Sequence, residues 1–456
     1  MADAGALDAI FKAYDVRGLV GSQLDDDTVR AIGAATAEVL ADAGALVVGH
    51  DMRPSSRPLV DAFIAGVTAT GTDVIDIGLA STDMLYFASG EFDAAGAMFT
   101  ASHNPPAYNG IKLCRAGAQP VSMDTGLADI RDRARDVLSA PLARDGATAG
   151  EVRTEDVLPR FAAHVRTFVD LAALRPVTLA VDAGNGMAGH VVPAVFEDLP
   201  FEVVELYFEL DGTFPNHPAN PLEPENLVDL QRVVREQGLP LGLAFDGDAD
   251  RMFAVDEHGD LVPSSLIAAV VADRLLAAHP GETILYNLIC SHAVPETIEA
   301  AGGTAVRTRV GHSFIKARMA ETGAIFGAEH SGHYYFRDNY RADSGIIAAL
   351  VLLEAVADAG APLSEVVAPY DRYVASGELN FEVADVPAAT AAVAEAFADR
   401  GESDREDGLT VRTAAGWFNL RPSNTEPLLR LNVEGPDRPS MERLRDEVAA
   451  TVRAAG

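Results

Sequence analysis

The stretch Thr100-Ala101-Ser102-His103-Asn104-Pro105-Pro106 joins a short apolar run to a pair of prolines. The apolar run over residues 94–99 is typical of a buried strand. The prolines disfavour a helix or a paired strand directly afterwards. We therefore expect Ser102 to lie on a rigid loop at a strand end, where α/β proteins usually carry their chemistry. Taken alone, the stretch favours a serine with an ordinary loop hydrogen bond over a nucleophile or phosphate carrier.

The composition narrows the class of protein. A chain of 456 residues is longer than one core usually serves, so three or four domains are expected. The net charge of −33 disfavours nucleic acids and anionic membranes as partners. The sequence has no apolar run long enough for a membrane helix and no secretory signal at its start. Two cysteines, Cys114 and Cys290, argue against a disulfide framework and favour the cytoplasm.

Predicted strands and helices alternate over most of the chain, which is typical of an α/β fold. The predicted strands cover residues 46–49, 73–78, 177–181, 241–245, 252–255, 283–288 and 305–308. A charged, Ala- and Gly-rich stretch at 140–151 predicts a linker. The pattern changes near residue 370, where a half-exposed strand at 378–383 and a hairpin at 410–420 are expected.

A second polar loop, Asp246-Gly247-Asp248-Ala249-Asp250-Arg251, stands between two predicted strands. Its three carboxylates alternate along the chain and can converge on one cation, and hard oxygen ligands indicate Mg²⁺ or Ca²⁺. An EF-hand is excluded because Arg251 occupies the obligatory glycine position and strands flank the loop. Arg251 is better explained if the cation shares its site with a phosphate.

Lysine is rare in this chain, which has only Lys12, Lys112 and Lys316. Asn109-Gly110 is typical of a tight turn and predicts that Lys112 folds back toward Ser102. A lysine there could act as a general acid or base, or attract phosphate. The plain alternative is a solvated surface lysine. Near the start of the chain, Tyr14 and Arg17 could donate hydrogen bonds to a phosphate.

Three later loops also carry chemical groups. His312 follows Gly311 at a predicted strand end and could move a proton near neutral pH, although a structural histidine is the commoner case. Residues 329–333 offer a carboxylate, a hydroxyl and imidazoles, which suit sugar hydroxyls. Residues 421–427 place an arginine, two hydroxyls and an amide on a proline-braced loop, which suits a phosphate.

Five motifs in this order resemble the α-D-phosphohexomutase superfamily, most closely its phosphomannomutase/phosphoglucomutase branch. They are K-A-Y-D-V-R-G at 12–18, T-A-S-H-N-P at 100–105, D-G-D-A-D-R at 246–251, E-H-S-G-H at 329–333 and R-P-S-N-T at 421–425. The resemblance spans the whole chain. It implies four domains around a central cleft, with three related α/β domains at 1–148, 152–254 and 255–368 and a C-terminal α+β domain at 370–456.

The resemblance also implies a reaction. Phosphorylated Ser102 would transfer its phosphoryl group to a hexose phosphate of mannose or glucose, giving a hexose 1,6-bisphosphate that turns over in the cleft. Ser102 would then take back the other phosphate, so that the phosphate moves reversibly between positions 1 and 6. One Mg²⁺ ion, held by Asp246, Asp248, Asp250 and the Ser102 phosphate, would neutralise charge during transfer.

Further roles follow from the resemblance alone. The implied catalytic residues are Ser102, Lys112 as the general acid or base, His312 as a second candidate, and Arg251. Glu329 and Ser331 would hold sugar hydroxyls, and Arg421 with its loop would hold the non-reacting phosphate. The implied substrate-binding residues are Tyr14, Arg17, His103, Asn104, Arg251, Gly311, His312, Glu329, Ser331, His333, Arg421, Ser423, Asn424 and Thr425.

One departure from the branch leaves the substrate preference open. Ile289 stands where members often carry a basic residue, which removes one expected phosphate contact. The alternatives are a phosphoglucosamine mutase, a catalytically silent sugar-phosphate binder and a phosphatase acting through the same serine. The silent binder is disfavoured because Ser102, Lys112 and the three aspartates of residues 246–250 are all present.

Overall fold

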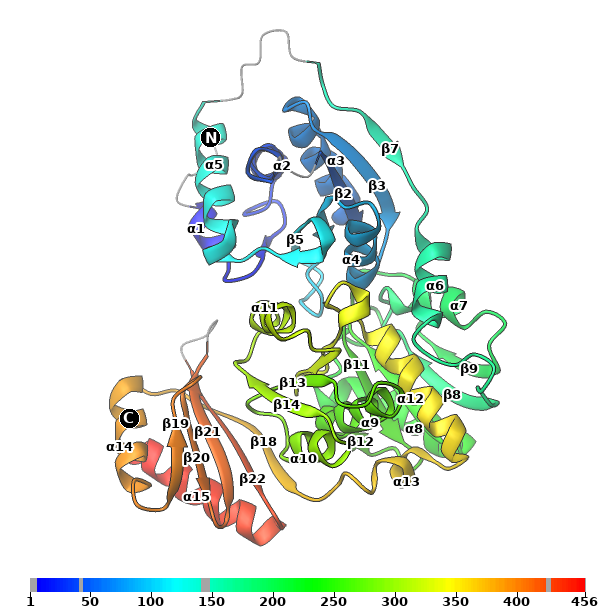
Figure 1. Ribbon diagram of the computed structural model, residues 1–456. Helices are drawn as coiled ribbons and strands as arrows, with labels where there is room; N and C mark the ends of the chain where they lie inside the picture. Colours follow the sequence, from blue (N-terminus) through cyan, green and yellow to red (C-terminus); the bar gives the residue numbers. More distant parts are fainter. Residues whose placement is uncertain (1–5, 41–43, 141–147, 424–427, 456) are drawn as a thin grey trace.

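Four sheets follow one another along the chain, each in its own structural unit (Figure 1). The computed structural model describes residues 6–40, 44–140, 148–423 and 428–455. The first three units combine parallel strands with helices, and the fourth is antiparallel, so the predicted fold class is confirmed. None of the helices in these described ranges is long and apolar enough to cross a membrane.

The first unit has the sheet order β1-β5-β4-β2-β3-β7, with β6 beside β5. Its central strands are parallel, whereas β5 runs antiparallel to β4 and to β1. The strands are β1 Val16–Leu19, β2 Ala45–His50, β3 Asp73–Leu79, β4 Ala95–Phe99, β5 Tyr108–Arg115, β6 Gln119–Pro120 and β7 Val152–Thr154. The helices are α1 Ala6–Ile10, α2 Asp26–Val39, α3 Ser56–Ala69, α4 Thr82–Glu91 and α5 Leu127–Ser139. All five residues of β4 are buried, as the apolar run predicts.

The second unit has the sheet order β12-β11-β10-β8-β9. Strand β10 is parallel to β8 and antiparallel to β11, so a tight loop joins β10 to β11. The strands are β8 Val177–Asp182, β9 Phe201–Leu206, β10 Leu241–Phe245, β11 Met252–Asp256 and β12 Leu261–Val262. The helices are α6 Leu158–Arg166, α7 Ala188–Phe196 and α8 Val228–Gln237.

The third unit has the sheet order β14-β13-β15-β16-β17. The strands are β13 Thr283–Asn287, β14 Thr304–Thr308, β15 Phe326–Ala328, β16 Tyr334–Phe336 and β17 Ala342–Asp343. The helices are α9 Ser264–Ala278, α10 Ala293–Ala300, α11 His312–Thr322, α12 Gly345–Ala359 and α13 Leu363–Val367. Helix α12 is buried on nearly all sides and contacts both α9 of its own unit and α6 and β11 of the second unit.

The first three units share one apolar core. It includes Met98 of β4, Phe245 of β10 and Phe326 of β15, one strand from each sheet. Because this cluster is continuous, it holds the ends of β4 and β10, and the loops that follow these strands, against each other.

The fourth unit is an antiparallel sheet in the order β18-β22-β21-β20-β19. Its strands are β18 Val374–Phe381, β19 Gly401–Asp404, β20 Leu409–Thr413, β21 Gly416–Pro422 and β22 Leu429–Gly435. Helices α14 Val386–Ala396 and α15 Arg438–Ala455 pack on this sheet and complete a separate core (Figure 1). The side chain of Asp385 caps α14 by accepting a hydrogen bond from the Ala388 N–H.

Two sheets extend past the predicted limits of their domains. Strand β7 pairs with β3 of the first sheet, although it lies beyond residue 148. Strands β11 and β12 complete the second sheet and end at Asp256 and Val262, beyond residue 254. In both cases an edge strand follows a turn or linker, a position that local composition does not reveal.

The expected turn at Asn109-Gly110 is wrong, because both residues lie inside β5. Gly110 is opposite Arg17 of β1, and a Cβ atom there would come 2.6 Å from the Val16 carbonyl oxygen and 2.7 Å from that of Thr100. The glycine therefore lets the backbone of β5 lie close to Val16 of β1 and to Thr100, the residue after β4. Lys112 reaches the cleft along the straight strand, opposite Met98 of β4, and not by a reversal of the chain.

Helices α2 and α3 of the first unit pack through glycine, which yields a stability prediction. A Cβ atom on Gly66 would lie 2.0 Å from the Arg30 carbonyl oxygen. We expect Gly66→Ala to lower the free energy of unfolding by about 1–3 kcal/mol through overpacking. Ala65→Ser, on the exposed side of the same helix, should change it by less than about 0.5 kcal/mol. Equal effects of the two substitutions in urea denaturation would contradict this packing.

Candidate active site

The Ser102 loop projects from the end of β4 toward the second unit (Figure 1). Ser102 has a φ of 49°, in the left-handed region that few non-glycine residues adopt. Its N–H donates to the Thr100 hydroxyl at 2.9 Å, and the residue is 5% exposed. Such strain persists only where the surroundings fix it, and it is common at functional sites.

Arg53 fixes this loop. Its guanidinium is buried at the start of α3 and donates to four backbone carbonyl oxygens: those of Ser102 at 2.9 Å, Asn104 at 2.6 Å, Pro105 at 2.9 Å and Tyr108 at 3.1 Å. Its Nε donates to Asp51 at 3.2 Å, so the buried charge is paired. A flexible ammonium could not satisfy this planar array of acceptors.

The β10–β11 loop brings three buried carboxylates to the serine. The Ser102 hydroxyl donates to Asp246 Oδ2 at 2.7 Å. Single oxygens of Asp246, Asp248 and Asp250 lie within 4.8 Å of one another. Oδ1 of Asp248 and Oδ1 of Asp250 are buried without a hydrogen-bond partner among the described residues. Unpartnered buried carboxylate oxygens in this number suit a hard divalent cation.

Two cations balance this charge. The Lys112 ammonium lies 2.7 Å from Asp248 Oδ2 and 2.6 Å from Asp250 Oδ2. Burial alone would lower the pKa of Lys112, but these two carboxylates raise it well above its ordinary value. Burial works to raise the pKa of Asp248, yet Lys112 keeps it below the ordinary value. On the other side, Arg251 donates to Asp246 Oδ2 at 2.8 Å and to the Ser102 hydroxyl at 3.2 Å.

The remaining groups beside the serine differ in charge. Burial raises the pKa of Asp246 to about 6, against the nearby Arg251. Burial and Arg251 lower the pKa of His103 to about 2, so its ring is neutral at pH 7. Arg251 donates to His103 Nδ1, which lies 3.2 Å from the Ser102 oxygen. The serine thus sits among donors and carboxylates arranged for an anion and a cation together.

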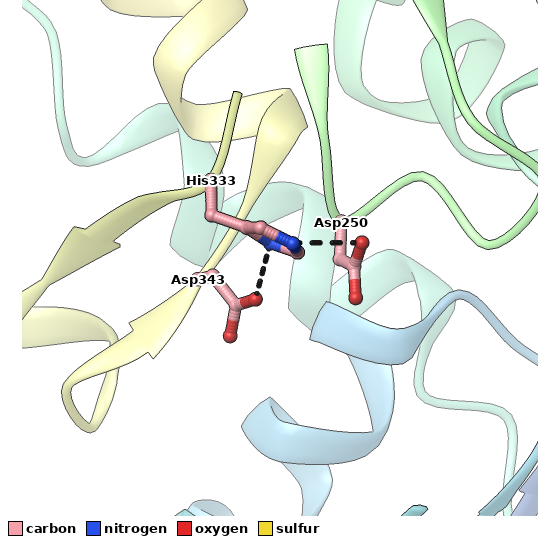
Figure 2. A group of neighbouring side chains, drawn as sticks. All are labelled: Asp250, His333 and Asp343. Carbon is pink, nitrogen blue, oxygen red and sulfur yellow. Dashed lines mark hydrogen bonds and ion pairs between the residues drawn. The ribbon is translucent and has the colours of Figure 1, made fainter. Parts of the chain in front are cut away.

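A histidine of the third unit lies between Asp250 of the carboxylate loop and Asp343 of its own unit (Figure 2). His333 Nδ1 lies 2.9 Å from Asp343 Oδ2 and 3.9 Å from Asp250 Oδ1. Burial works to lower the pKa of His333, but Asp250 and Asp343 raise it above its ordinary value. Lys316 pairs with the other Asp343 oxygen at 2.9 Å, and its ammonium lies 3.8 Å from the Tyr86 ring centre of the first unit. This group therefore joins three of the four units.

Of the N-terminal residues, Arg17 contacts the Ser102 loop and Tyr14 contacts the third unit. Arg17 donates to the Asn104 side chain at 2.6 Å and to Asp15 at 2.6 Å. Tyr14 packs edge-on against Phe314 of α11, and burial raises its pKa. Lys12 is exposed and bonded to the Ala9 carbonyl oxygen, so it takes no part in the site.

The third unit carries the other predicted sugar-binding residues. Glu329 is 3% exposed and already accepts hydrogen bonds from the Tyr335 hydroxyl at 2.7 Å and the Gly311 N–H at 3.0 Å. Ser331 lines the open cavity. The backbone of His312 begins α11, and its side chain lies outside the described part of the structure.

A cavity of about 910 Å³ connects these loops with the fourth unit. His103, Ser331 and Arg421 all contribute to its lining. Arg421 is 5% exposed on β21, and burial lowers its pKa although Glu378 opposes this effect. The Ser423 N–H donates to the Leu428 carbonyl oxygen at 2.8 Å. The predicted residues Asn424 and Thr425 lie outside the described residues.

Ile289 also lines this cavity, where it packs with Trp417 of the fourth unit and Leu288. The position provides an apolar contact between two units and no charge for a phosphate.

Sequence reasoning missed several residues that shape the site. Thr82 donates to Asp248 at 2.6 Å from the first turn of α4, and Arg53, Asp343 and Lys316 hold the loops described above. The best signal is Asp51-Met52-Arg53-Pro54 after a predicted strand, because α/β proteins place their sites at strand ends. No local pattern marks Thr82 or Asp343.

The family comparison agrees with this geometry. Models of the phosphoglucomutase/phosphomannomutase family match in four parts: alpha/beta/alpha domain I at residues 8–138, domain II at 159–259, domain III at 263–373 and the C-terminal domain at 378–451. Fold and site together define the chain as a phosphohexomutase. It belongs to the phosphoglucomutase/phosphomannomutase family, so the predicted resemblance is confirmed.

Relatives and solved structures support the same class. "Phosphohexose mutases" of Xanthomonas campestris is 43% identical, covering 93% of this chain and 94% of that protein. A phosphomannomutase of Salmonella montevideo is 41% identical, covering 96% and 97%. A family protein from Burkholderia thailandensis has a TM-score of 0.88 at 33% identity, covering 100% and 98%. An N-acetylphosphoglucosamine mutase from Aspergillus fumigatus, solved with GlcNAc-6P and magnesium, shares the fold at TM-score 0.64 and 15% identity, covering 99% and 98%. A phosphohexose mutase, an isomerase, is therefore the supported activity.

The hydrogen bonds of Arg53 generate a prediction for the Ser102 loop. Arg53→Lys keeps the charge but loses the planar fork, so the loop should shift and kcat should fall by about a hundredfold, as for a 1 Å misplacement of a reacting group. Arg57→Lys, at an exposed position in the first turn of α3, is the matched control and should keep kcat. Steady-state kinetics of both variants checks this. A fully active Arg53→Lys enzyme would show that the loop holds its own shape.

Proposed function

We propose that the protein interconverts hexose 1-phosphate and hexose 6-phosphate, with mannose and glucose as the sugars, through a phosphate carried by Ser102. The observation that supports this most is the Ser102 hydroxyl, 2.7 Å from Asp246 and beside two buried carboxylates with unpartnered oxygens. A hydroxyl in this setting can carry a phosphate only if a cation balances the added charge. The proposal therefore includes both a phosphate on Ser102 and a bound cation.

The proposed metal ligands are Asp246, Asp248, Asp250 and Ser102 in its phosphorylated form. When bound, one Mg²⁺ would supply charge neutralisation for phosphoryl transfer, which is most of what this chemistry asks of a protein. The oxygen-only donor set and its unpartnered atoms fit such a hard ion. The solved magnesium complex of the Aspergillus mutase supports this choice of ion.

In the proposed reaction, the bond between phosphorus and Ser102 Oγ breaks and a bond to a sugar hydroxyl oxygen forms. The serine oxygen gains a proton and the sugar hydroxyl loses one. Arg251, 3.2 Å from the serine oxygen, is placed to neutralise charge on the moving group. The second half of the reaction reverses these changes with the other phosphate of the 1,6-bisphosphate, after that intermediate has turned in the cleft.

Lys112 is proposed as the general acid or base. Its raised pKa means that it holds a proton at neutral pH, so it can donate that proton as a general acid. His312 remains the second candidate. His333 lies near Asp250, which Lys112 also contacts, and is added here because an imidazole can take up or release a proton.

The substrate would span the cavity between Ser102 and the fourth unit. Tyr14, Arg17, His103 and Asn104 would contact it from the first unit. Gly311, Glu329, Ser331 and His333 would contact the sugar from the third unit. Arg421 and its loop would anchor the phosphate that is not reacting.

A phosphoglucosamine mutase is the alternative activity. Assays on mannose 1-phosphate, glucose 1-phosphate and glucosamine 1-phosphate separate it from the proposed one. The free, buried thiols of Cys114 and Cys290 support a proposed location in the cytoplasm.

Ser102 is expected to carry a phosphate in active protein. Intact mass and peptide mapping should find it on this residue, and Ser102→Ala should lose both the phosphate and mutase turnover because the acceptor oxygen is gone. Ser139→Ala, at an exposed position, should keep both. Mutase activity in Ser102→Ala, or active enzyme with no phosphate on Ser102, would contradict the mechanism.

Asp248→Asn is expected to weaken Mg²⁺ binding and to lower kcat by at least about a hundredfold, because it removes charge from the metal site. Calorimetric titration with Mg²⁺ measures the binding directly. Asp260→Asn, an exposed aspartate beyond β11, is the control for the loss of one charge. Unchanged Mg²⁺ affinity in Asp248→Asn would place the ion elsewhere.

Arg421→Lys is expected to impair reaction with the 1-phosphate and the 6-phosphate alike, because the same anchor serves both orientations. The loss should be about 1.5–3 kcal/mol, the range for hydrogen bonds to charged groups. Steady-state kinetics in both directions measures it, with the exposed Arg438→Lys as control, and Ser102 phosphorylation should survive. An effect in one direction only would assign the anchor to one phosphate.

A further inference from the structure

Two charged side chains without a role in the proposed mechanism face the same cavity as Arg421. Arg430 on β22 is directly opposite Arg421 of β21, and Glu378 lies on the next strand, β18. Glu378 Oε2 is 2.9 Å from Arg421 Nη2, and Glu378 Oε1 is 3.2 Å from Arg430 Nη1. One carboxylate thus bridges two guanidinium groups, with one oxygen toward each.

This arrangement reduces the repulsion between two arginines on neighbouring strands of the sheet. Like charges directly opposite on neighbouring strands repel each other. The side chains of Arg421 and Arg430 are 6% and 24% exposed, so water screens the repulsion only in part. An anion between the two groups relieves this repulsion, and in the described structure Glu378 lies there. Guanidinium groups also suit a phosphate dianion, because each can donate two parallel hydrogen bonds to its oxygens.

We propose that Glu378 is the internal anion of the phosphate subsite and that Arg430 is its second guanidinium. While the cleft is empty, Glu378 holds both arginines at the spacing of an oxyanion. The non-reacting phosphate of the hexose phosphate displaces the carboxylate, and Glu378 takes the arginines back when that phosphate leaves. This inference rests on the proposed function, since it gives the Arg421 anchor a second arginine and a release device.

Magnitudes favour such an exchange. The Glu378–Arg430 pair is partly exposed, so water weakens it. Charge-assisted, bidentate contacts of a phosphate dianion to two guanidinium groups are stronger. A phosphate that enters the cavity therefore displaces Glu378 from the two arginines. The carboxylate still lowers the net affinity, which helps a bisphosphate that must leave the anchor and return in the opposite orientation.

The experiment is a titration of the full-length protein with inorganic phosphate at pH 8, where phosphate is a dianion. Trp417 is the one tryptophan of the sequence and lines the same cavity, four residues before Arg421 on β21, so its fluorescence can report binding. Calorimetry provides a second readout. The variants are Glu378→Gln, Arg430→Gln and, as matched control, Glu402→Gln at an exposed position on β19 of the same sheet.

Glu378→Gln should tighten phosphate binding about fivefold, which corresponds to about 1 kcal/mol, because the competing charge is gone. Arg430→Gln should weaken it about tenfold, and Glu402→Gln should leave it unchanged. In mutase assays Glu378→Gln should lower both KM and kcat, since the substrate binds more tightly and the intermediate is released more slowly. A simple structural brace would instead raise KM.

Weaker or unchanged phosphate binding in Glu378→Gln would overturn the proposal, as would unchanged binding in Arg430→Gln. A wild-type protein that does not bind inorganic phosphate in either readout would overturn it as well. The titration needs no turnover. If the wild-type protein lacks mutase activity while the phosphate affinities shift as expected, the proposed function fails and the subsite assignment stands.

Discussion

The site depends on the burial of three carboxylates at one point. Asp246, Asp248 and Asp250 are almost fully excluded from water, and unpaired charges in such a place would be very costly. Lys112 from the first unit and Arg251 from the loop itself form ion pairs with these carboxylates. Because the partners come from different units, the charge balance is complete only when the first two units are docked.

The same constraint explains why the loops around it are so firmly held. Arg53 fixes four carbonyl groups of the Ser102 loop, and the core shared by three sheets fixes the strands from which the loops emerge. The third unit adds His333 and Asp343 to the network. The fourth unit has its own core and brings arginine to the other end of the cavity. An overall charge of −33 is compatible with an anionic substrate, since Arg251 lies beside Ser102 and Arg421 and Arg430 line the cavity.

Much of the fold and the chemical loops could be predicted from the sequence. The Ser102 and Asp246 loops follow apolar strands, and that local pattern survives in the structure. Contacts that depend on tertiary geometry could not be predicted. Arg53 follows a predicted strand, but the sequence does not show which backbone carbonyls it binds, and the contact of Glu378 with two arginines depends on the order of β18, β22 and β21. The turn predicted at Asn109-Gly110 is wrong because glycine is needed there for a different reason: β5 lies close to the backbone of Val16 and Thr100.

The most direct test of the account follows the phosphoryl group itself. Enzyme carrying a ³²P-labelled phosphate on Ser102 is mixed, in a single turnover, with unlabelled mannose 1-phosphate or glucose 1-phosphate, and the label is located by chromatography and peptide mapping. The account predicts that the label leaves Ser102 and appears at position 6 of the sugar, while Ser102 regains an unlabelled phosphate. Label that stays on the protein while product forms, or that is released as inorganic phosphate, would contradict it.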